Sequence, residues 1–288
     1  MPIFSTVAGG ASFVPTGYSN LATITSTGTW THPGGASVSS PKQVFVVAVG
    51  GGGGGGGGSS SSNGEGCGSG GGGGGSGSVD GGEAVITGAV SVVIGAQGAA
   101  GAGTGSYNSL NFGSNGANGG QTSFGTTGNS NFAFNALGGE GGQSGRMWGY
   151  RTANSGNAIF TTIAKGGAPG GQGFLLGPAR ALGHGKSGND TNKNVLGGLV
   201  SGSGGGGGGS CSGVGTGTGA GASGGIGIFG NGGNGGNGAV YNDGTAGTNA
   251  TGYGAGGGGG GTGIRPNFQG VSSGAGGNGS PGVVYIYY

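Results

Sequence analysis

The feature that most constrains this chain is a run of nine consecutive glycines, Gly50 to Gly58, entered directly from the apolar segment 44–49. Such a run is either a flexible linker, since glycine loses the most backbone entropy on ordering, or part of an ordered bundle of polyproline-II-like helices. In a bundle, chains without side chains approach closely enough to exchange N–H···O=C hydrogen bonds on all three faces of each helix. Shorter runs follow at 70–75, 204–209 and 256–261.

A repeat of three residues distinguishes the two interpretations. A helix inside a bundle must be pure glycine, whereas a helix at the surface can carry a side chain at every third position. Asn231, Asn234 and Asn237 are separated by pairs of glycines, and Glu140 and Gln143 have the same spacing. A linker has no reason to keep this period, so the sequence predicts an ordered bundle.

Composition limits what else can stabilise the chain. Glycine accounts for 95 of 288 residues and proline for only 8, so the collagen signature is absent. Leucine, isoleucine and valine are too sparse for an ordinary core of this length. The fold is therefore expected to depend largely on backbone hydrogen bonds, helped by Cα–H···O contacts and a small apolar base.

Strand-like segments lie near both ends of the chain. The segment 21–30 is rich in threonine, 42–49 is apolar on both faces, and 83–87, 89–94 and 281–288 also have strand character. We expect a mostly irregular and β fold without an α-helix of consequence. Its β base comprises 1–49, 79–94 and 281–288, and its glycine-rich part comprises 50–78 and 95–280. The loops of ordinary composition are expected at 105–137, 144–165, 174–196, 239–254 and 262–273.

The charge, the lengths of the apolar runs and the N-terminal residues argue against several classes of protein. Only 5% of residues are charged and the net charge is +2, which is too weak for a nucleic-acid binder. No apolar run approaches the length of a membrane span, and the N-terminal residues do not resemble a secretory signal. Cys67 and Cys211 flank glycine runs in matched places; a cytosolic product would keep them reduced, and whether they pair stays open.

The motifs that suggest chemistry fail in detail. The phosphate-loop-like sequence ending at Lys186 has Arg180 where the first glycine is required. The calcium-loop-like sequence from Asp190 has Val195 and Ser201 at two required positions. No set of histidine and acid partners accompanies the candidate serines, and no metal-ligand spacing occurs. We therefore predict no enzyme, no cofactor and no metal.

The aromatic and basic loops are the candidates for recognition. Arg146, Trp148, Tyr150 and Arg151 are compressed into six positions and are residue types that dominate binding hot spots. The alternative is that Trp148 caps the bundle. At the other end of the chain, apolar residues of 1–35 are candidates either for attachment to a partner or for covering the base: Ile3, Phe4, Phe13, Tyr18 and Trp30. The full predicted binding set is Arg146, Trp148, Tyr150, Arg151, Lys165, Phe174, Arg180, Lys186, Lys193, Tyr241, Tyr253 and Phe268.

Three short motifs resemble the glycine-rich domains of tailed-bacteriophage fibres: Gly-Thr-Trp-Thr-His-Pro at 28–33, the apolar strand that enters poly-glycine at 44–58, and the terminal strand 282–288. Among these domains, the chain is most similar to the detachable tip adhesins of T-even-type phages. The resemblance implies a monomeric bundle of about ten polyglycine-II helices in stacked layers. The adhesins of that type begin with a Gly-Trp-Ile-Gly segment that grips the fibre, and this sequence begins differently.

The resemblance predicts a non-enzymatic tail-fibre adhesin at the distal tip of the virion, synthesised in the host cytoplasm. Its expected partners are the tail-fibre protein and a host outer-membrane protein or lipopolysaccharide. A second possibility is an ice-binding protein, which needs a flat, regular face of small residues, and a third is a purely structural fibre segment. The long aromatic and basic loops argue against both.

Overall fold

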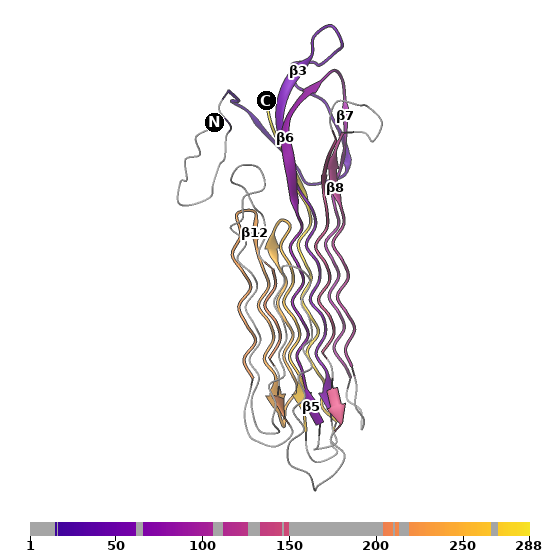
Figure 1. The fold of residues 1–288 in the computed structure, drawn as a ribbon, viewed down its shortest axis with the longest axis vertical. Coiled ribbons are helices and arrows are strands. Elements are labelled where there is room, and N and C mark those ends of the chain that lie inside the picture. Colours follow the sequence, from indigo (N-terminus) through magenta and orange to yellow (C-terminus); the bar gives the residue numbers. More distant parts are fainter. Residues whose placement is uncertain are drawn as a thin grey trace.

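The computed structural model describes residues 15, 17–61, 66–105, 112–125, 133–145, 147–149, 204–209, 211–212, 219–265 and 270–288. These residues form short β-strands and long irregular segments, and none of them is helical. A β-sandwich occupies one end of the molecule, and glycine-rich segments run away from it side by side (Figure 1). We call the opposite end the distal end.

The sandwich consists of two antiparallel sheets of four strands. The first has the order β1-β16-β3-β6, with β1 at Leu21–Ile24, β16 at Val283–Tyr287, β3 at Lys42–Val49 and β6 at Val79–Ile86. The second has the order β2-β7-β8-β9, at Gly28–Trp30, Val90–Val93, Thr122–Phe124 and Phe134–Ala136. The C-terminal strand thus pairs with both the first described strand and β3, with Ile286 opposite Val46.

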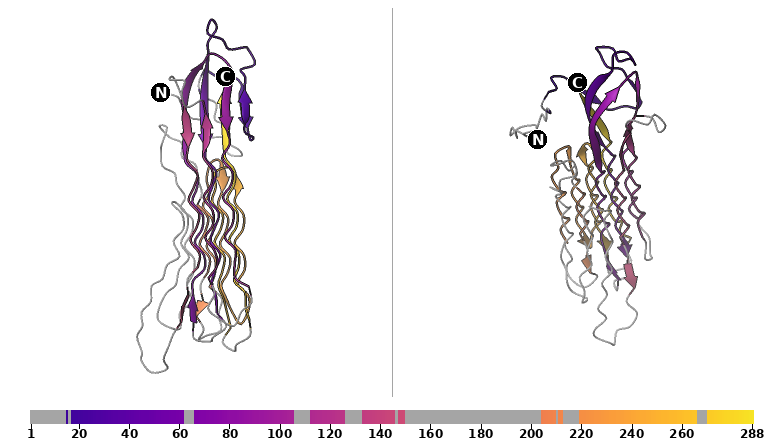
Figure 2. Two further views of the ribbon diagram at one scale, coloured as in Figure 1. Left: turned by 90° about the vertical axis from the view of Figure 1, so that its right-hand side faces the viewer. Right: turned by 45° about the horizontal axis from the view of Figure 1, so that its top comes forward.

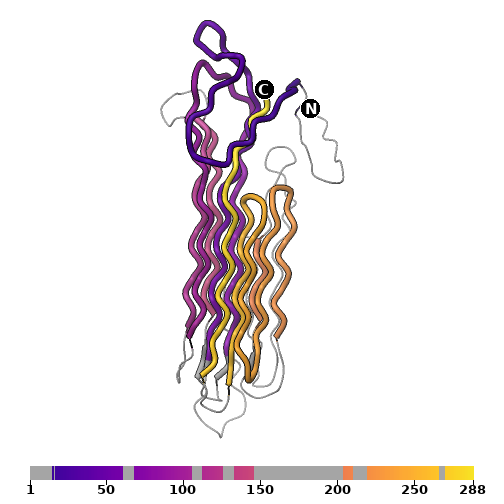
Figure 3. The backbone as a smooth tube through the Cα atoms, turned by 180° about the vertical axis from the view of Figure 1, so that it is seen from behind, coloured from indigo at the N-terminus to yellow at the C-terminus, as the bar shows by residue number. Residues whose placement is uncertain are grey.

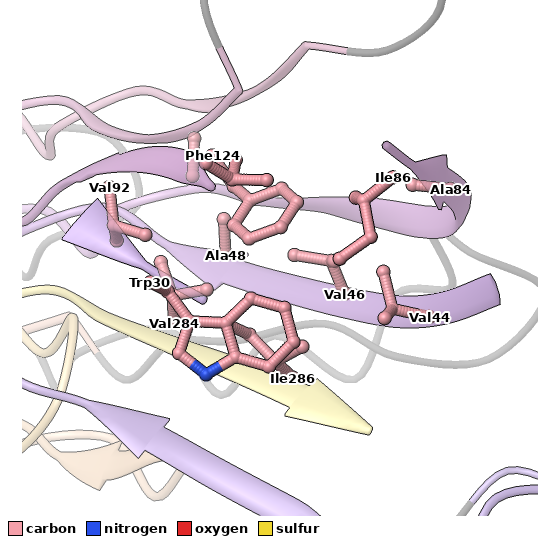
Figure 4. Packing of buried hydrophobic residues seen from close by; sticks show 12 residues of the cluster. Trp30, Val44, Val46, Ala48, Ala84, Ile86, Val92, Phe124, Val284 and Ile286 are labelled. Carbon is pink, nitrogen blue, oxygen red and sulfur yellow. The ribbon is translucent and has the colours of Figure 1, made fainter. Parts of the chain in front are cut away.

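The core of the sandwich follows from the alternation of side chains along these strands. Val44, Val46 and Ala48 of β3 point toward the second sheet and are fully buried. They meet Phe124 and Trp30, whose rings lie 6.4 Å apart (Figure 4). The two sheets are also joined at one edge, because the Asp80 carboxylate of β6 accepts the Asn135 N–H of β9 at 2.7 Å.

Some glycine-rich segments prolong strands of the sandwich, as the views in Figure 2 show. Segment 50–58 leaves β3, and segment 69–78 returns to β6. Others end short of the sandwich and reverse at 226–231 and 251–254, where β12 (Gly230–Asn231) pairs with β14 (Thr251–Gly252) (Figure 3). The described glycine segments are 50–58, 69–78, 95–104, 113–120, 138–145, 204–209, 219–225, 232–238, 244–250, 255–262 and 271–281.

Two small sheets of three strands close the distal end. β4 (Ser60–Ser61), β15 (Gly263–Ile264) and β13 (Ala239–Val240) pair in parallel. In the other sheet, β5 (Gly66–Gly68) lies between β10 (Met147–Gly149) and β11 (Cys211–Ser212). Cys211 pairs with Gly68 and Cys67 pairs with Ser212, so the two cysteines lie on adjacent strands one residue out of register.

The hydrogen bonds of segment 50–58 follow a three-residue cycle. Gly53 donates its N–H to Gly75 O and Gly56 donates to Gly72 O, both at 2.8 Å, so every third residue reaches the same neighbouring segment. The intervening N–H groups reach two further segments, and the carbonyls accept from three more. The six neighbours are 69–78, 113–120, 271–281, 95–104, 138–145 and 255–262.

The same bonds arrange the described segments in three layers. Segment 255–262 is a second centre with six bonded neighbours, and it lies beside 50–58 in the middle layer. The middle layer is 113–120, 50–58, 255–262 and 232–238; one outer layer is 138–145, 69–78, 204–209 and 219–225; the other is 95–104, 271–281 and 244–250.

The centre of this arrangement has no room for a side chain. A Cβ atom at Gly53 would lie 2.0 Å from Glu140 O, and one at Gly55 would lie 2.0 Å from Gly258 O. At the periphery only every third residue faces inward, so segment 95–104 needs glycine at 95, 98 and 101 and carries side chains, mostly alanine, at most other positions. This steric rule explains both the pure glycine runs and the three-residue period.

Two loops predicted from the sequence are wrong. The range 105–137 contains the glycine segment 113–120 and the strands β8 and β9, and 239–254 contains the segment 244–250 and the strands β13 and β14. These segments lie at the edge of the bundle, where two positions in three face outward. Their composition therefore looks ordinary, although Gly113, Gly116 and Gly119 keep the period.

Outward N–H groups without a backbone neighbour are satisfied by polar side chains. Asn234 Oδ1 accepts the Gly224 N–H at 2.9 Å, and the Asn234 N–H donates to Thr248 Oγ1 at 2.7 Å. Asn278 Oδ1 likewise accepts the Ala100 N–H at 2.8 Å. Asparagine, serine and threonine on the surface of the bundle thus complete its hydrogen bonding.

Candidate binding surfaces

The distal end holds part of the predicted binding set. Trp148 lies in β10, where its backbone pairs with that of Cys67 at the edge of a three-stranded sheet. The backbone of this tryptophan is therefore at the end of the molecule farthest from the sandwich (Figure 1). Nine other members of the predicted set lie outside the described residues: Arg146, Tyr150, Arg151, Lys165, Phe174, Arg180, Lys186, Lys193 and Phe268.

Tyr241, another member of the predicted set, has an exposed side chain on a fixed backbone at the distal end. It follows β13 and is 43% exposed, and its φ of 67° is the one positive value among the described non-glycine residues. Its N–H donates to Ile264 O at 2.7 Å, which holds this conformation against a cost of roughly 1–3 kcal/mol. The adjacent Asp243 carboxylate accepts the Ser272 N–H at 2.7 Å. The reversal 241–243 thus presents an aromatic ring and a carboxylate on a fixed backbone.

Tyr253, from the same predicted set, lies at the other end of the bundle. It follows β14 next to the sandwich, and its ring meets that of Tyr285 edge-on at 6.5 Å. The structure therefore separates Tyr253 from Tyr241 by the length of the glycine segments. The segments alternate in direction, which explains why successive reversals fall at opposite ends.

The sandwich end contains the two described candidates for attachment. Trp30 is only 9% exposed and its ring packs between Phe124 and Tyr288, so it is a core residue. Tyr18 is half-buried against Phe45, and burial followed by the nearby Glu83 charge raises its pKa. Ile3, Phe4 and Phe13 lie outside the described residues.

An aromatic row on the outer face of the first sheet was not predicted as a group. Phe45 and Tyr287 are paired in register and their rings lie 6.3 Å apart, while Tyr285 stacks on Phe229 at 5.7 Å. Burial, and secondarily the neighbouring Tyr285, raises the pKa of Tyr287 to about 12. The alternation of tyrosines in the last strand could have revealed this row, but Phe229 comes from a reversal whose position the sequence does not fix.

A group of hydroxyls marks the transition from the bundle to the distal end. Ser60 and Thr104 share a hydrogen bond, Thr104 Oγ1 lies 3.0 Å from Ser273 Oγ, and Ser273 Oγ donates to Gly58 O at 2.7 Å. These contacts satisfy the backbone where the glycine run ends. Serine and threonine there have a structural role in the hydrogen bonding of the bundle.

The described residues include one histidine, His32, which lies in the sandwich. They contain no group of three histidine, cysteine or acidic side chains that could hold a metal ion. Burial and the Lys42 charge lower the pKa of His32, whose ring packs against Trp30 and Tyr288 in the sandwich. Among the same described residues, no helix is long and apolar enough to cross a membrane.

Comparisons with known proteins identify no family for this chain. No protein-family model matches the chain, and no curated protein matches it significantly.

Proposed function

We propose that the glycine segments are polyglycine-II helices in a stacked bundle. A helix of the polyproline-II type has three residues per turn and no internal hydrogen bonds, so all its N–H and C=O groups must bond to neighbours. The three-residue donor cycle of segment 50–58 and its six bonded neighbours support this assignment. The glycines that a Cβ would bring to about 2 Å from a carbonyl support it as well.

We further propose that the protein is a non-enzymatic receptor-binding adhesin at the distal tip of a bacteriophage tail fibre. The observation that carries this proposal is the separation of two ends by the length of the hydrogen-bonded bundle (Figure 1). The sandwich joins the C-terminal strand β16 to β1, the first described strand. The reversal at Tyr241 and the strand that contains Trp148 lie at the opposite end. The sandwich would face the tail-fibre protein, and the distal end would face the host cell.

The distribution of charge favours an anionic receptor. The described residues contain two cationic side chains, Lys42 and Arg265, and four anionic ones, Asp80, Glu83, Glu140 and Asp243. Since the whole chain has a net charge of +2, the other residues have a net charge of +4. Arginine and lysine of this set suit the phosphates of lipopolysaccharide or the acidic loops of an outer-membrane protein.

The test is binding of the purified protein to host cells, with two variants at opposite ends. Trp148→Ala should weaken binding about thirtyfold, as expected for loss of a hot-spot aromatic. Joint replacement of Arg146 and Arg151 by alanine should weaken it too, and more strongly at low salt. The matched control is Ile226→Ala, which removes a 72% exposed side chain at the sandwich end and should leave binding unchanged.

Melting of each variant separates recognition from folding. Trp148→Ala should melt like the unmodified protein; a lower melting temperature would mean that Trp148 caps the bundle. If Trp148→Ala binds fully while Ile226→Ala loses binding, the sandwich end faces the host cell and the distal end does not. If neither protein nor variants bind any host cell, the adhesin function is refuted.

One observation favours ice binding as a second candidate. The outer layer of 95–104, 271–281 and 244–250 presents Ala100, Ala275 and Ala246 at least partly to solvent, with Asn278 and Asn249 hydrogen-bonded across it. Such a layer of small residues is the regular face that this function needs. Inhibition of ice recrystallisation by the purified protein, at concentrations where a glycine-rich control has no effect, would establish it.

A further inference from the structure

The bundle creates a chemically sensitive dipeptide at its surface. An outward asparagine accepts a neighbour's N–H, and the next residue faces inward, where only glycine fits. A Cβ at Gly235, which follows Asn234, would lie 2.0 Å from Gly207 O, and one at Gly279, which follows Asn278, would lie 2.2 Å from Gly52 O. The described residues therefore contain Asn-Gly at Asn115, Asn118, Asn231, Asn234, Asn237 and Asn278.

Asn-Gly is the sequence in which asparagine deamidates most readily, because glycine offers no side chain to hinder attack. The glycine nitrogen loses its proton and bonds to Cγ of asparagine, while the Cγ–Nδ2 bond breaks and ammonia leaves. Water then opens the resulting succinimide at either carbonyl and yields aspartate or isoaspartate. The reaction requires a free glycine N–H and a side chain that can turn back toward its own backbone.

In the bundle the attacking nitrogen is engaged at every one of these dipeptides. The following glycines donate their N–H groups to backbone carbonyls of neighbouring segments at 2.8–3.0 Å. The bonds are Gly116 to Gly142, Gly119 to Gly139, Gly232 to Gly225, Gly235 to Ala222, Gly238 to Gly219 and Gly279 to Gly98.

At five of the six dipeptides the electrophilic carbon is held away from its own backbone as well. Side-chain Oδ1 atoms accept N–H groups of adjacent segments at 2.8–2.9 Å, which fixes Cγ toward the neighbour. The pairs are Asn115 with Ser144, Asn118 with Gly141, Asn234 with Gly224, Asn237 with Gly221 and Asn278 with Ala100.

We propose that these Asn-Gly dipeptides are latent modification sites that the folded bundle keeps inert and that unfolding releases. Isoaspartate adds an atom to the backbone, so the inward glycines on its two sides no longer fit one three-residue register. A chain modified while unfolded therefore cannot rebuild the bundle. Isoaspartate therefore accumulates irreversibly only in chains that have unfolded. This proposal does not depend on the receptor or on the adhesin function.

The first experiment compares the full chain in its folded state with the same chain in guanidinium chloride, at equal mildly alkaline pH and temperature. Peptide mapping by mass spectrometry follows the conversion of each asparagine. In denaturant all Asn-Gly sites, including Asn63 outside the described residues, should react at similar rates. In the folded protein Asn234, Asn237 and Asn278 should react at least about a hundredfold more slowly, because only opened molecules react. Equal rates in the two states would overturn the proposal.

The second experiment tests the refolding block. Chains aged in denaturant should refold with a yield that falls as isoaspartate accumulates. The matched control is Asn234→Asp with Asn237→Asp, in which the carboxylates still accept the Gly224 and Gly221 N–H groups and the backbone keeps its length. This variant should refold as the unmodified protein does. If aged chains that contain isoaspartate refold equally well, the modification does not block refolding.

Discussion

Replacement of a single central glycine by alanine is the sharpest test of the bundle. A Cβ at Gly53 would lie 2.0 Å from Glu140 O, whereas one at Gly88, in the turn between β6 and β7, would have no atom within 4 Å. Both substitutions are Gly→Ala, so they have the same effect on the unfolded chain, and neither glycine is among those with positive φ. They differ only in what the new methyl group meets.

The cost at Gly53 can be estimated from the contacts that must break. Ordinary van der Waals contact requires segment 138–145 to move away by more than an ångström, which disrupts its bonds to 50–58. These are the N–H groups of Gly139, Gly142 and Gly145, bonded at 2.7–2.8 Å. Each donor left unpaired and buried costs about 1–3 kcal/mol, and the sum approaches the total stability of about 5–15 kcal/mol.

The assay is soluble yield and thermal melting of Gly53→Ala and Gly88→Ala, purified in parallel. Gly53→Ala should be unfolded or melt far below the unmodified protein. Gly88→Ala should be neutral or more stable by about 0.4–1 kcal/mol, because alanine restricts the unfolded chain. Equal melting temperatures for the two variants would refute the argument that the central glycines are required sterically.

Three further predictions concern the sandwich and the bundle surface. Deleting β16 (Val283–Tyr287) removes the strand between β1 and β3 and should cause aggregation through the exposed apolar edge, measured by light scattering; a monomeric truncation would contradict this. The raised pKa of Tyr287 means that folding favours its protonated form, so the stability contribution is complete below about pH 10 and lost as pH rises toward 12. Denaturant unfolding between these pH values should show the loss, and Tyr287→Phe should reduce it. Asn234→Ala removes one exposed acceptor, and melting should fall only slightly because water can replace it.

The sequence predicts the kind of fold, a glycine bundle on a β base, better than it predicts the positions of the individual strands and segments. The three-residue period and the apolar strand before Gly50 suffice to indicate a glycine bundle on a β base, because both arise from local sterics. The strands at 122–124 and 134–136 are too short to have a signal of their own. The first forms by pairing with β7, and the second forms by pairing with the first. The strand β6 begins at Val79 rather than Glu83, since Gly81 and Gly82 pair closely with Val47 and Val46.

The candidate surfaces were predicted less completely. Whether a reversal falls at the sandwich or at the distal end depends on how many times the chain has already turned. The edge segments 113–120 and 244–250 looked like loops, so the count of turns was wrong and Tyr253 could not be assigned to an end. Burial of Trp30 in the sandwich depends on Phe124, which is distant in sequence.

The nearly complete absence of side chains inside the bundle has a consequence for heat capacity. Unfolding of an ordinary domain exposes apolar surface and raises the heat capacity by about 12–15 cal/mol/K per residue, which curves the dependence of stability on temperature. The central segments 50–58 and 255–262 bury mainly peptide groups, and exposure of polar surface lowers the heat capacity. The stability of this protein should therefore change little on cooling, so a bundle of bare backbone keeps its shape at temperatures where an apolar core weakens.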